Sequence, residues 1–506
     1  MKYTNFASKF EKTFIFIIKL FMIGLLFISF FGIFYTQIPQ FKTINRTSLI
    51  SFGMFFISVL GSIRIYGGFP VGKKQTSDIR NSAILGTLVG DIITFITMYT
   101  MGVSSSKYYE FSDEFVGPVD AISDNIRPSF STFLHHYLRD KIFSGILLLI
   151  VVFFIQIVII WFFAKFSNKI YFKLNKPKKT LIIYSDPQYL PLLVSKIKKN
   201  STRWKLVKLV KHNDPKILEI IRKNQAVFFF DVPRQTRTKL IAFCYKHNKD
   251  IYISPDISDI IVYSSSTLLV DDTTVLSSTD YGMSFEQLFL KRFVDILVSL
   301  ILIILTSPVM ILFAIAIKIY DKGPILYKQR RLTKGGQEFN VLKFRSMIVN
   351  AEKNTGATIA QKNDSRITPV GKILRRFRID ELPQLFNIFK GDMSVVGPRP
   401  ERMEIAEKYK QHLPEFQYRL KVKAGLTGLA QIMSKYNTTP KDKLTLDISY
   451  IQQYSLWLDI KIILRTLIVF LKSDSTEGSK ELPKDITDFI ENELKNEDDF
   501  KKAKTD

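Results

Sequence analysis

The sequence is poor in the residues that build disulfides and soft-metal sites. Its 506 residues include one cysteine, Cys244, which excludes an internal disulfide and any metal site built from several cysteines. The five histidines are scattered except for His135-His136, so neither a histidine-built site nor a soft transition metal is expected. Acidic residues are also scarce, because 46 Asp and Glu stand against 72 Lys and Arg, a formal net charge of +26. This balance indicates an anionic partner: nucleic acid, phosphorylated small molecules or anionic lipid.

Apolar residues, in contrast, are concentrated in long runs. Four runs are each long enough to cross the hydrocarbon core as a helix, which takes about 20 residues. They lie at about 14–35, 49–67, 83–103 and 142–164. The first is too long for a cleavable signal, and no small-residue cleavage site follows it. Asp91 and nearby glycines weaken the prediction for the third run.

Charged residues are distributed unevenly around these runs. Lysines and arginines precede the first run, separate the second from the third, and follow the fourth. The loop at about 104–141 instead carries acidic residues: Glu110, Asp113, Glu114, Asp120 and Asp124. By the positive-inside rule, the N-terminus and everything after residue 165 are expected to be cytosolic. We therefore predict a transmembrane anchor of four helices over residues 1–170.

Residues 178–284 have a different pattern. Short apolar runs at 181–184, 207–210 and 226–230 alternate with helix-like stretches. Such alternation predicts a parallel-sheet, Rossmann-like α/β module. A dinucleotide site would have a glycine-rich loop after the first strand, but the sequence there is Ser185-Asp186-Pro187-Gln188. We expect a packing or regulatory module that does not bind dinucleotides in the usual way.

A fifth apolar run, Phe293 to Ile317, is also long enough to span a bilayer. Basic residues flank both of its ends, whereas a crossing helix would place one flank outside. Ser307-Pro308 lies in its middle, where proline removes a backbone hydrogen bond and bends a helix. Together these features favour a re-entrant helix that returns to the cytosolic face, with a crossing helix as the alternative.

The stretch beyond this run is basic and polar. Residues 328–345 hold six basic residues against one acid, and Gly335-Gly336 predicts a turn between two strands. Nucleic-acid binding would explain such a surface. However, aromatic residues do not alternate with the basic ones, and a membrane element lies just upstream. Diphosphates and anionic head groups therefore fit the context better.

Two adjacent carboxylates, Asp380 and Glu381, follow three arginines directly: Arg375, Arg376 and Arg378. The next residues predict a short amphipathic helix with Pro383 in its first turn and Gly391 just after its end. Its apolar face would consist of Leu382, Leu385, Phe386 and Phe389. The carboxylates would then lie near the helix N-terminus, where free N–H groups favour anions. A solvated charged turn is the plainer alternative.

Further along, two prolines flank a single arginine in Pro398-Arg399-Pro400. Each proline restricts the backbone around Arg399 to extended conformations. This arrangement would present one guanidinium group rigidly, although such a sequence is also common in ordinary surface turns.

The second half of the chain carries a series of motifs in order. They are Lys291-Arg292-x-x-Asp295, Ser307-Pro308, Gly323-Pro324, Lys343-Phe344-Arg345-Ser346-Met347, Asp380-Glu381-Leu382-Pro383-Gln384, the segment from Gly391 to Pro400, Gly425-Leu426-Thr427-Gly428, the segment from Lys435 to Pro440, and Asp447-x-x-Tyr450-Ile451. Together they resemble the monotopic phosphoglycosyl transferases, the bacterial sugar transferase family that initiates capsular and exopolysaccharide repeat units. Two positions depart from that pattern: Ala424 replaces a usual proline, and Met433-Ser434 replaces a glycine-containing pair.

The expected fold is that of a membrane protein with α and α/β parts. A four-helix transmembrane anchor (1–170) and a Rossmann-like module (178–284) would precede a monotopic catalytic domain (286–475). The resemblance assigns that last domain a re-entrant helix and interfacial helices, and an amphipathic pattern over Tyr454 to Leu471 suits an interfacial helix. A flexible acidic tail is expected over 476–506.

The resemblance also implies an activity. A sugar-1-phosphate would pass from a UDP-sugar to undecaprenyl phosphate with release of UMP. Asp380 would be the nucleophile that forms a phosphosugar-aspartyl intermediate, and Asp380 and Glu381 would hold Mg²⁺. Arg375 and Arg399 would clamp phosphates, and the further phosphate-binding residues would be Lys343, Arg345 and Arg378.

The partners implied are the UDP-sugar donor, the lipid acceptor and membrane lipids, but not nucleic acid. A homodimer and contacts with other polysaccharide-assembly proteins stay open. The chain would reside in the bacterial cytoplasmic membrane with its catalytic domain on the cytosolic face. Two rival hypotheses are a membrane scaffold or regulator with an inactive transferase domain, and a polytopic transferase whose fifth run crosses the bilayer. The sequence does not identify the sugar.

Overall fold

The computed structural model describes residues 2–35, 46–72, 75–113, 143–187, 190–278, 282–349, 351, 364–434, 438–470, 488–490 and 493. The chain divides into two compact units, Met1–Pro177 and Lys178–Asp506. The boundary between them falls next to the predicted start of the α/β module.

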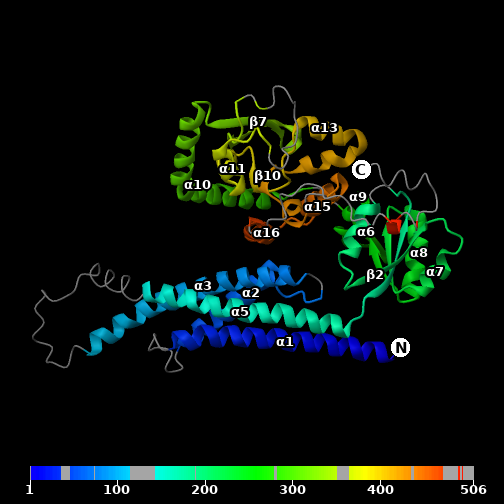
Figure 1. The fold of residues 1–506 in the computed structure, drawn as a ribbon, viewed down its shortest axis with the longest axis horizontal. Coiled ribbons are helices and arrows are strands. Elements are labelled where there is room, and N and C mark those ends of the chain that lie inside the picture. Colours follow the sequence, from blue (N-terminus) through cyan, green and yellow to red (C-terminus); the bar gives the residue numbers. More distant parts are fainter. Residues whose placement is uncertain are drawn as a thin grey trace, which may run out of the picture. The chain divides into compact units, whose positions relative to one another are not determined.

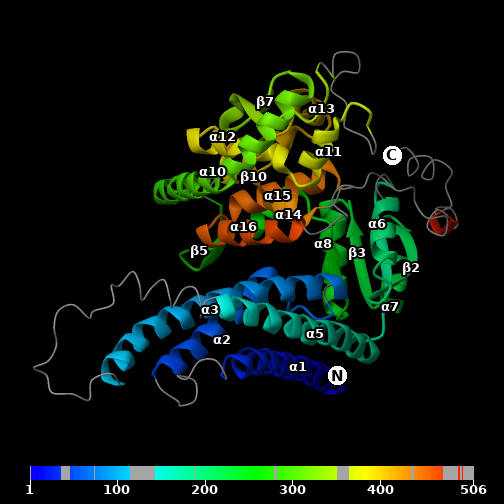
Figure 2. The ribbon, with the colours of Figure 1, turned by 60° about the vertical axis from the view of Figure 1, so that its left-hand side comes forward.

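The first unit is a bundle of long helices. They are α1 (Lys2–Phe34), α2 (Arg46–Tyr66), α3 (Thr76–Asp113) and α5 (Phe143–Leu174). Figure 2 shows them side by side, with α2 against α3 and α5 against both α1 and α3. Aromatic and branched residues such as Phe30, Phe55 and Ile160 form its core. Asp91 is fully buried among these helices, as is usual for an ionisable residue in an apolar helix.

Five described helices are long and apolar enough to cross a membrane: the four of this unit and α10 (Phe285–Asp321). The four predicted N-terminal runs are therefore helical. The helix α3 extends to Asp113, so residues 104–113 of the predicted acidic loop are helical instead. Residues 114–141 of that loop lie outside the described chain.

The second unit begins with a parallel four-stranded sheet. Its strands are β1 (Lys178–Tyr184), β2 (Trp204–Lys211), β3 (Ala226–Phe230) and β4 (Asp250–Ile253), in the order β2-β1-β3-β4. Figure 1 shows α6 (Leu190–Lys198) and α8 (Arg234–Lys246) on opposite sides of this sheet. The α7 helix (Ile217–Lys223) packs on the same face as α8. The predicted α/β module is confirmed.

The face of the sheet under α6 is also covered by residues near the C-terminus. Ile490 is 2% exposed and packs with Leu190 and Leu209. The Glu493 carboxylate accepts a hydrogen bond of 3.1 Å from the backbone N–H of Leu209 on the edge strand β2. For these residues the structure differs from the flexible tail expected at 476–506, because an apolar side chain there completes a half-covered sheet face. The rest of that segment lies outside the described chain.

The α/β module ends with a short helix, and a hairpin then links it to the last domain. They are α9 (Ile257–Tyr263), β5 (Ser266–Val270) and β6 (Thr273–Ser277). The domain itself starts with α10 and the hairpin β7 (Leu326–Leu332) and β8 (Glu338–Phe344), which turns at η4 (Lys334–Gly336) as predicted. Then follow α11 (Pro369–Arg376), η5 (Ile379–Glu381), α12 (Gln384–Lys390), β9 (Ser394–Val396), α13 (Met403–His412), η6 (Pro414–Lys421), β10 (Gly425–Thr427), α14 (Leu429–Met433), α15 (Pro440–Gln452) and α16 (Leu456–Phe470).

Both ends of α10 are attached to this same domain. Near its start, the Lys291 ammonium donates to the Val396 carbonyl at 2.9 Å and to the Asp459 carboxylate at 2.6 Å. At its end, Asp321 pairs with Arg345. Figure 1 shows α10 bent into two arms. Residues up to Ile303 pack in one core cluster and residues from Met310 in another, so the bend falls in the stretch that contains Pro308.

Candidate active site

The two carboxylates lie in the short 3₁₀ turn η5, directly before α12. Arg378, the residue before this turn, has a left-handed backbone conformation with φ of 53°, which is uncommon for a residue other than glycine. The helix α12 begins at Gln384, directly after Pro383, which the sequence placed in the first turn, and Gly391 ends it in the left-handed conformation that the sequence indicated.

The face of α12 that packs inward differs from the prediction. Leu385 and Ile388 are buried, whereas Phe386 and Phe389 are each 45% exposed. Leu382 and Pro383 already have helical backbone angles, so the helical register is the predicted one, and the face that packs inward is the one that carries Leu385 and Ile388. The two exposed rings form an apolar surface on the outside of the domain.

Glu381 is held by two cationic side chains. The Arg399 guanidinium donates to Glu381 Oε1 at 2.7 Å, and the Lys343 ammonium lies 3.9 Å from the same oxygen. Burial disfavours the charged carboxylate, but Arg399 and Lys343 outweigh it and lower the pKa of Glu381 to about 2. Burial lowers the pKa of Lys343 to about 8, although Glu381 acts in the opposite direction. Glu381 is therefore a fixed anion at neutral pH.

Asp380 is in a different situation. Among the described residues it makes no hydrogen bond and no ion pair. Burial and the neighbouring Glu381 charge raise its pKa, which Lys343, Arg375 and Arg399 partly offset. The turn thus presents one carboxylate that two cations hold at Oε1 and one whose oxygens are available for a ligand or a reaction.

The other predicted phosphate-binding residues divide into two groups. Arg375 donates to the Ser346 hydroxyl at 2.8 Å and acts electrostatically on Asp380, and Arg378 acts on Glu381. Arg345 instead points to the end of α10, where it donates to Asp321 at 2.6 Å and to the Pro324 carbonyl at 2.7 Å. Arg345 therefore stabilises the end of α10 and does not belong to the group of side chains around Asp380 and Glu381, the carboxylate dyad.

The loop that carries Arg399 rests on the parallel pair β9 and β10. The two strands approach closely at glycine positions: a Cβ on Gly425 would lie 2.1 Å from the Gly397 nitrogen. Ala424, where the resemblance anticipated proline, uses its N–H to donate to the Thr333 hydroxyl at 3.2 Å. Proline has no N–H, so this departure adds a hydrogen bond and leaves β10 in place. The segment Lys435 to Asn437 lies outside the described residues.

Several residues of the quoted motifs serve to assemble the site. Asp295 on α10 accepts hydrogen bonds from the Ser394 hydroxyl at 2.9 Å and from the Val395 N–H at 2.8 Å. Tyr450 donates to the same Asp459 carboxylate that pairs with Lys291. These side chains fix α10 and α16 against β9. Sequence reasoning named the motifs but missed these partners, because they are distant along the chain.

The site offers carboxylate oxygens as possible ligands for a metal ion. No group of three or more His, Cys, Asp or Glu side chains that could hold a metal occurs in the described part of the chain. Asp380 and Glu381 supply two neighbouring carboxylates, of which Glu381 is already paired. Mg²⁺ is commonly held by one or two carboxylates together with substrate phosphates, so this pair fits Mg²⁺ bound with a phosphate substrate.

Comparison with known proteins assigns these residues to a family. The model described as "Bacterial sugar transferase" matches residues 286–473, which include the dyad and Arg399. A UDP-glucose:undecaprenyl-phosphate glucose-1-phosphate transferase of Caulobacter vibrioides is 42% identical over 190 residues, which cover 37% of this chain and 71% of that protein. The chain belongs to the bacterial sugar transferase family.

Other relatives of this sugar transferase differ in the sugar that their names give. A UDP-N-acetylgalactosamine-undecaprenyl-phosphate N-acetylgalactosaminephosphotransferase of Aeromonas hydrophila is 44% identical over 186 residues, 36% of this chain and 44% of its own length. A galactosyl transferase of Streptococcus agalactiae is 41% identical over 205 residues, 38% of this chain and 45% of its own length. The match thus spans less than half of these two relatives and is concentrated in the domain that holds the dyad.

Proposed function

We propose that this sugar transferase moves a sugar-1-phosphate from a UDP-sugar to undecaprenyl phosphate, as the first membrane step of capsule or exopolysaccharide synthesis. The pairing of the dyad carries the proposal: Glu381 is clamped by cations, while Asp380 beside it has no hydrogen-bond or ion-pair partner among the described residues. The substrate classes come from the names of the relatives.

In the proposed reaction, an oxygen of Asp380 attacks the phosphorus next to the sugar. The bond from that phosphorus to the UMP oxygen breaks, and UMP leaves. An oxygen of undecaprenyl phosphate then attacks the same phosphorus, the bond to Asp380 breaks, and the carboxylate is restored. A carboxylate is an adequate nucleophile towards phosphorus. Lys343 and Arg399 would offset the negative charge that the two phosphates bring to the dyad.

We further propose that Asp380 and Glu381 hold Mg²⁺ together with substrate phosphate oxygens. When bound, the ion would supply positive charge that lowers the repulsion between the diphosphate and the dyad. Arg399 would keep Glu381 ionised and in a single orientation during this binding. A cavity bordered by α13 and η6 also lies beside Arg399, but neither Asp380 nor Glu381 lines it.

The topology of α10 is also proposed: both of its ends lie on the cytosolic face of the bacterial cytoplasmic membrane. The contacts of Lys291 and of Asp321 with one domain support this, as does the bend around Pro308. The test uses a Cys244→Ser background with single cysteines at the exposed Phe289 or Ile319. Impermeant maleimide should label both from the cytosolic side only, and labelling of the two from opposite sides would establish a crossing helix instead.

The activity is tested with membranes that contain the full chain, undecaprenyl phosphate and a panel of UDP-sugars. We expect one donor to yield UMP and a lipid-linked sugar, both dependent on the lipid acceptor. Asp380→Asn should abolish both products, while Glu338→Gln, an exposed glutamate on β8, should retain them. Failure of the wild-type chain with every donor would contradict the proposed function.

A further inference from the structure

The backbone of Pro398-Arg399-Pro400 is held at three successive carbonyl groups. The Pro398 carbonyl accepts from the Gly425 N–H at 2.9 Å. The Arg399 carbonyl accepts from the Arg419 guanidinium at 2.8 Å, and the Pro400 carbonyl accepts from Arg331 at 2.9 Å. Because the backbone is fixed at each step, the Arg399 side chain leaves it in one direction, towards Glu381. Of the three donors, Arg419 is the one that binds the carbonyl of Arg399 itself.

Arg419 itself depends on a second helix. It is 6% exposed, and its Nη2 lies 2.8 Å from an oxygen of Asp447, which is 2% exposed. Glu401 approaches the same guanidinium more loosely, at 3.7 Å. A buried cation without a partner of opposite charge is strongly destabilising, so Asp447 on α15 fixes the position of the Arg419 guanidinium. Neither residue touches the dyad.

The α/β module packs on the same helix. Leu444 and Ile448, on either side of Asp447, pack with Phe416 of η6 and with Ile257 of α9. The contact between α9 and α15 joins the module to the last domain within the second unit. The helix that carries Asp447 is therefore covered by the module on the face next to the ion pair.

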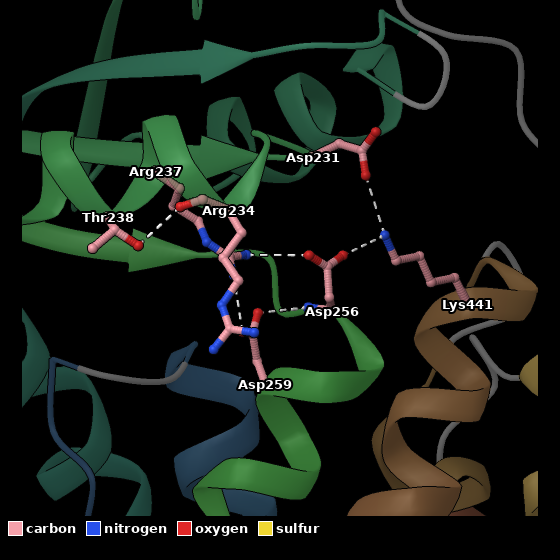
Figure 3. A network of polar contacts seen from close by, with 7 residues as sticks. All are labelled: Asp231, Arg234, Arg237, Thr238, Asp256, Asp259 and Lys441. Carbon is pink, nitrogen blue, oxygen red and sulfur yellow. Dashed lines mark hydrogen bonds and ion pairs between the residues drawn. The ribbon is translucent and has the colours of Figure 1, made fainter.

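A polar cluster fastens this contact, as Figure 3 shows. The Lys441 ammonium, in the first turn of α15, lies 3.0 Å from Asp256 and 3.2 Å from Asp231. Asp256 caps the start of α9, and Arg237 of α8 pairs with it at 3.3 Å. Arg237 also donates to Asp259 at 2.8 Å. The lysine thus ties α15 to two separate segments of the module.

We propose that Arg419 and Asp447 are positioning residues for Arg399, and that the α/β module supports them through its docking on α15. This inference rests on the proposed function, in which Arg399 orients Glu381 and binds donor phosphate. It gives the module a role in the transferase reaction that requires no ligand of its own. We expect substitutions of these residues to lower kcat/KM for the donor while the protein stays folded.

The test measures UMP release by the full chain in membranes, per active site, with varied donor and with varied lipid acceptor. Asp447→Asn should lower kcat/KM for the donor roughly tenfold, an effect typical of residues coupled through one ion-pair network. Lys441→Ala should lower the same parameter by a smaller factor. Glu404→Gln and Lys408→Ala, exposed substitutions on α13, are the matched controls and should leave it unchanged.

A double-mutant cycle then decides whether the residues act through Arg399. If they do, Asp447→Asn should cost much less in the Arg399→Lys background than in the wild type, and Lys441→Ala should behave likewise. Independent, multiplying effects would overturn the proposal. So would a fall in the melting temperature and in the number of active sites while kcat/KM per site stays constant. A wild-type chain that releases no UMP with any donor would refute the proposed function itself, which is a distinguishable outcome.

Discussion

Replacing Arg399 by lysine isolates the contribution of the guanidinium geometry from that of its charge. Lysine keeps the positive charge but cannot present the planar fork that arginine uses for carboxylates and phosphates. The backbone contacts of residue 399 do not involve its side chain, so the fold should be unaffected. The perturbation therefore falls on the hydrogen bond to Glu381 and on the phosphate of the donor.

The size of the effect follows from the site. A hydrogen bond to a charged partner is worth about 1.5–3 kcal/mol, roughly 10- to 160-fold in rate. Arg399 is 38% exposed and Glu381 is 15% exposed, so solvent screening favours the lower end. We expect Arg399→Lys to lower kcat/KM for the donor about tenfold.

The assay is UMP release in membranes at varied donor concentration, with Arg376→Lys as the control. Arg376 is an exposed arginine on α11 that lies over the Phe377 ring and, among the described residues, forms no ion pair with Asp380 or Glu381. The control should keep wild-type kinetics. If kcat/KM of Arg399→Lys also stays within twofold of the wild type, the orientation of Glu381 by the guanidinium fork does not contribute to catalysis. That result would refute the proposed role of Arg399.

Three further predictions concern the supports of the site. Gly425→Ala should abolish activity and reduce folded protein, because its Cβ would lie 2.1 Å from the Gly397 nitrogen; normal yield and rate would contradict the close strand approach. The pKa of about 8 at Lys343 predicts that the rate falls as pH rises through about 8, since the lysine then loses the charge that faces Glu381. Lys343→Arg should move this limb to higher pH, and an unchanged limb would assign it to another group. Ile490→Asp should destabilise the α/β module by roughly 2–4 kcal/mol, measured by limited proteolysis of the full chain, whereas an unaltered digestion rate would mean that its packing contributes little.

The sequence was most informative where several charged or conformationally restricted residues are neighbours in the chain. Adjacent carboxylates behind arginines and an arginine between prolines identified Asp380, Glu381 and Arg399 as residues that could act together, and the structure joins Arg399 to Glu381. Apolar run lengths identified the long helices, and strand–helix alternation identified the parallel sheet. Each of these signals is carried by neighbouring residues.

Features that depend on distant partners could not be predicted. Arg345 looked like another phosphate ligand, but its contact is Asp321, 24 residues earlier at the end of α10. The pairing of Arg419 with Asp447 has no local signal at all. The tail residue Ile490 lies in an acidic, polar segment, and only the uncovered face of the sheet explains its burial. In all three cases, tertiary packing selected the partner.

The proposed reaction requires Asp380 to be the nucleophile. To test this directly, the enzyme is mixed with its UDP-sugar donor in the absence of lipid acceptor and quenched with acid. The quenched protein is then analysed by mass spectrometry. We expect one added sugar-phosphate per chain, located by peptide mapping on Asp380 and lost when undecaprenyl phosphate is added before the quench. Asp380→Asn should carry no adduct and release no UMP. Release of UMP at the wild-type rate by Asp380→Asn, or a stable adduct on another residue, would contradict the claim.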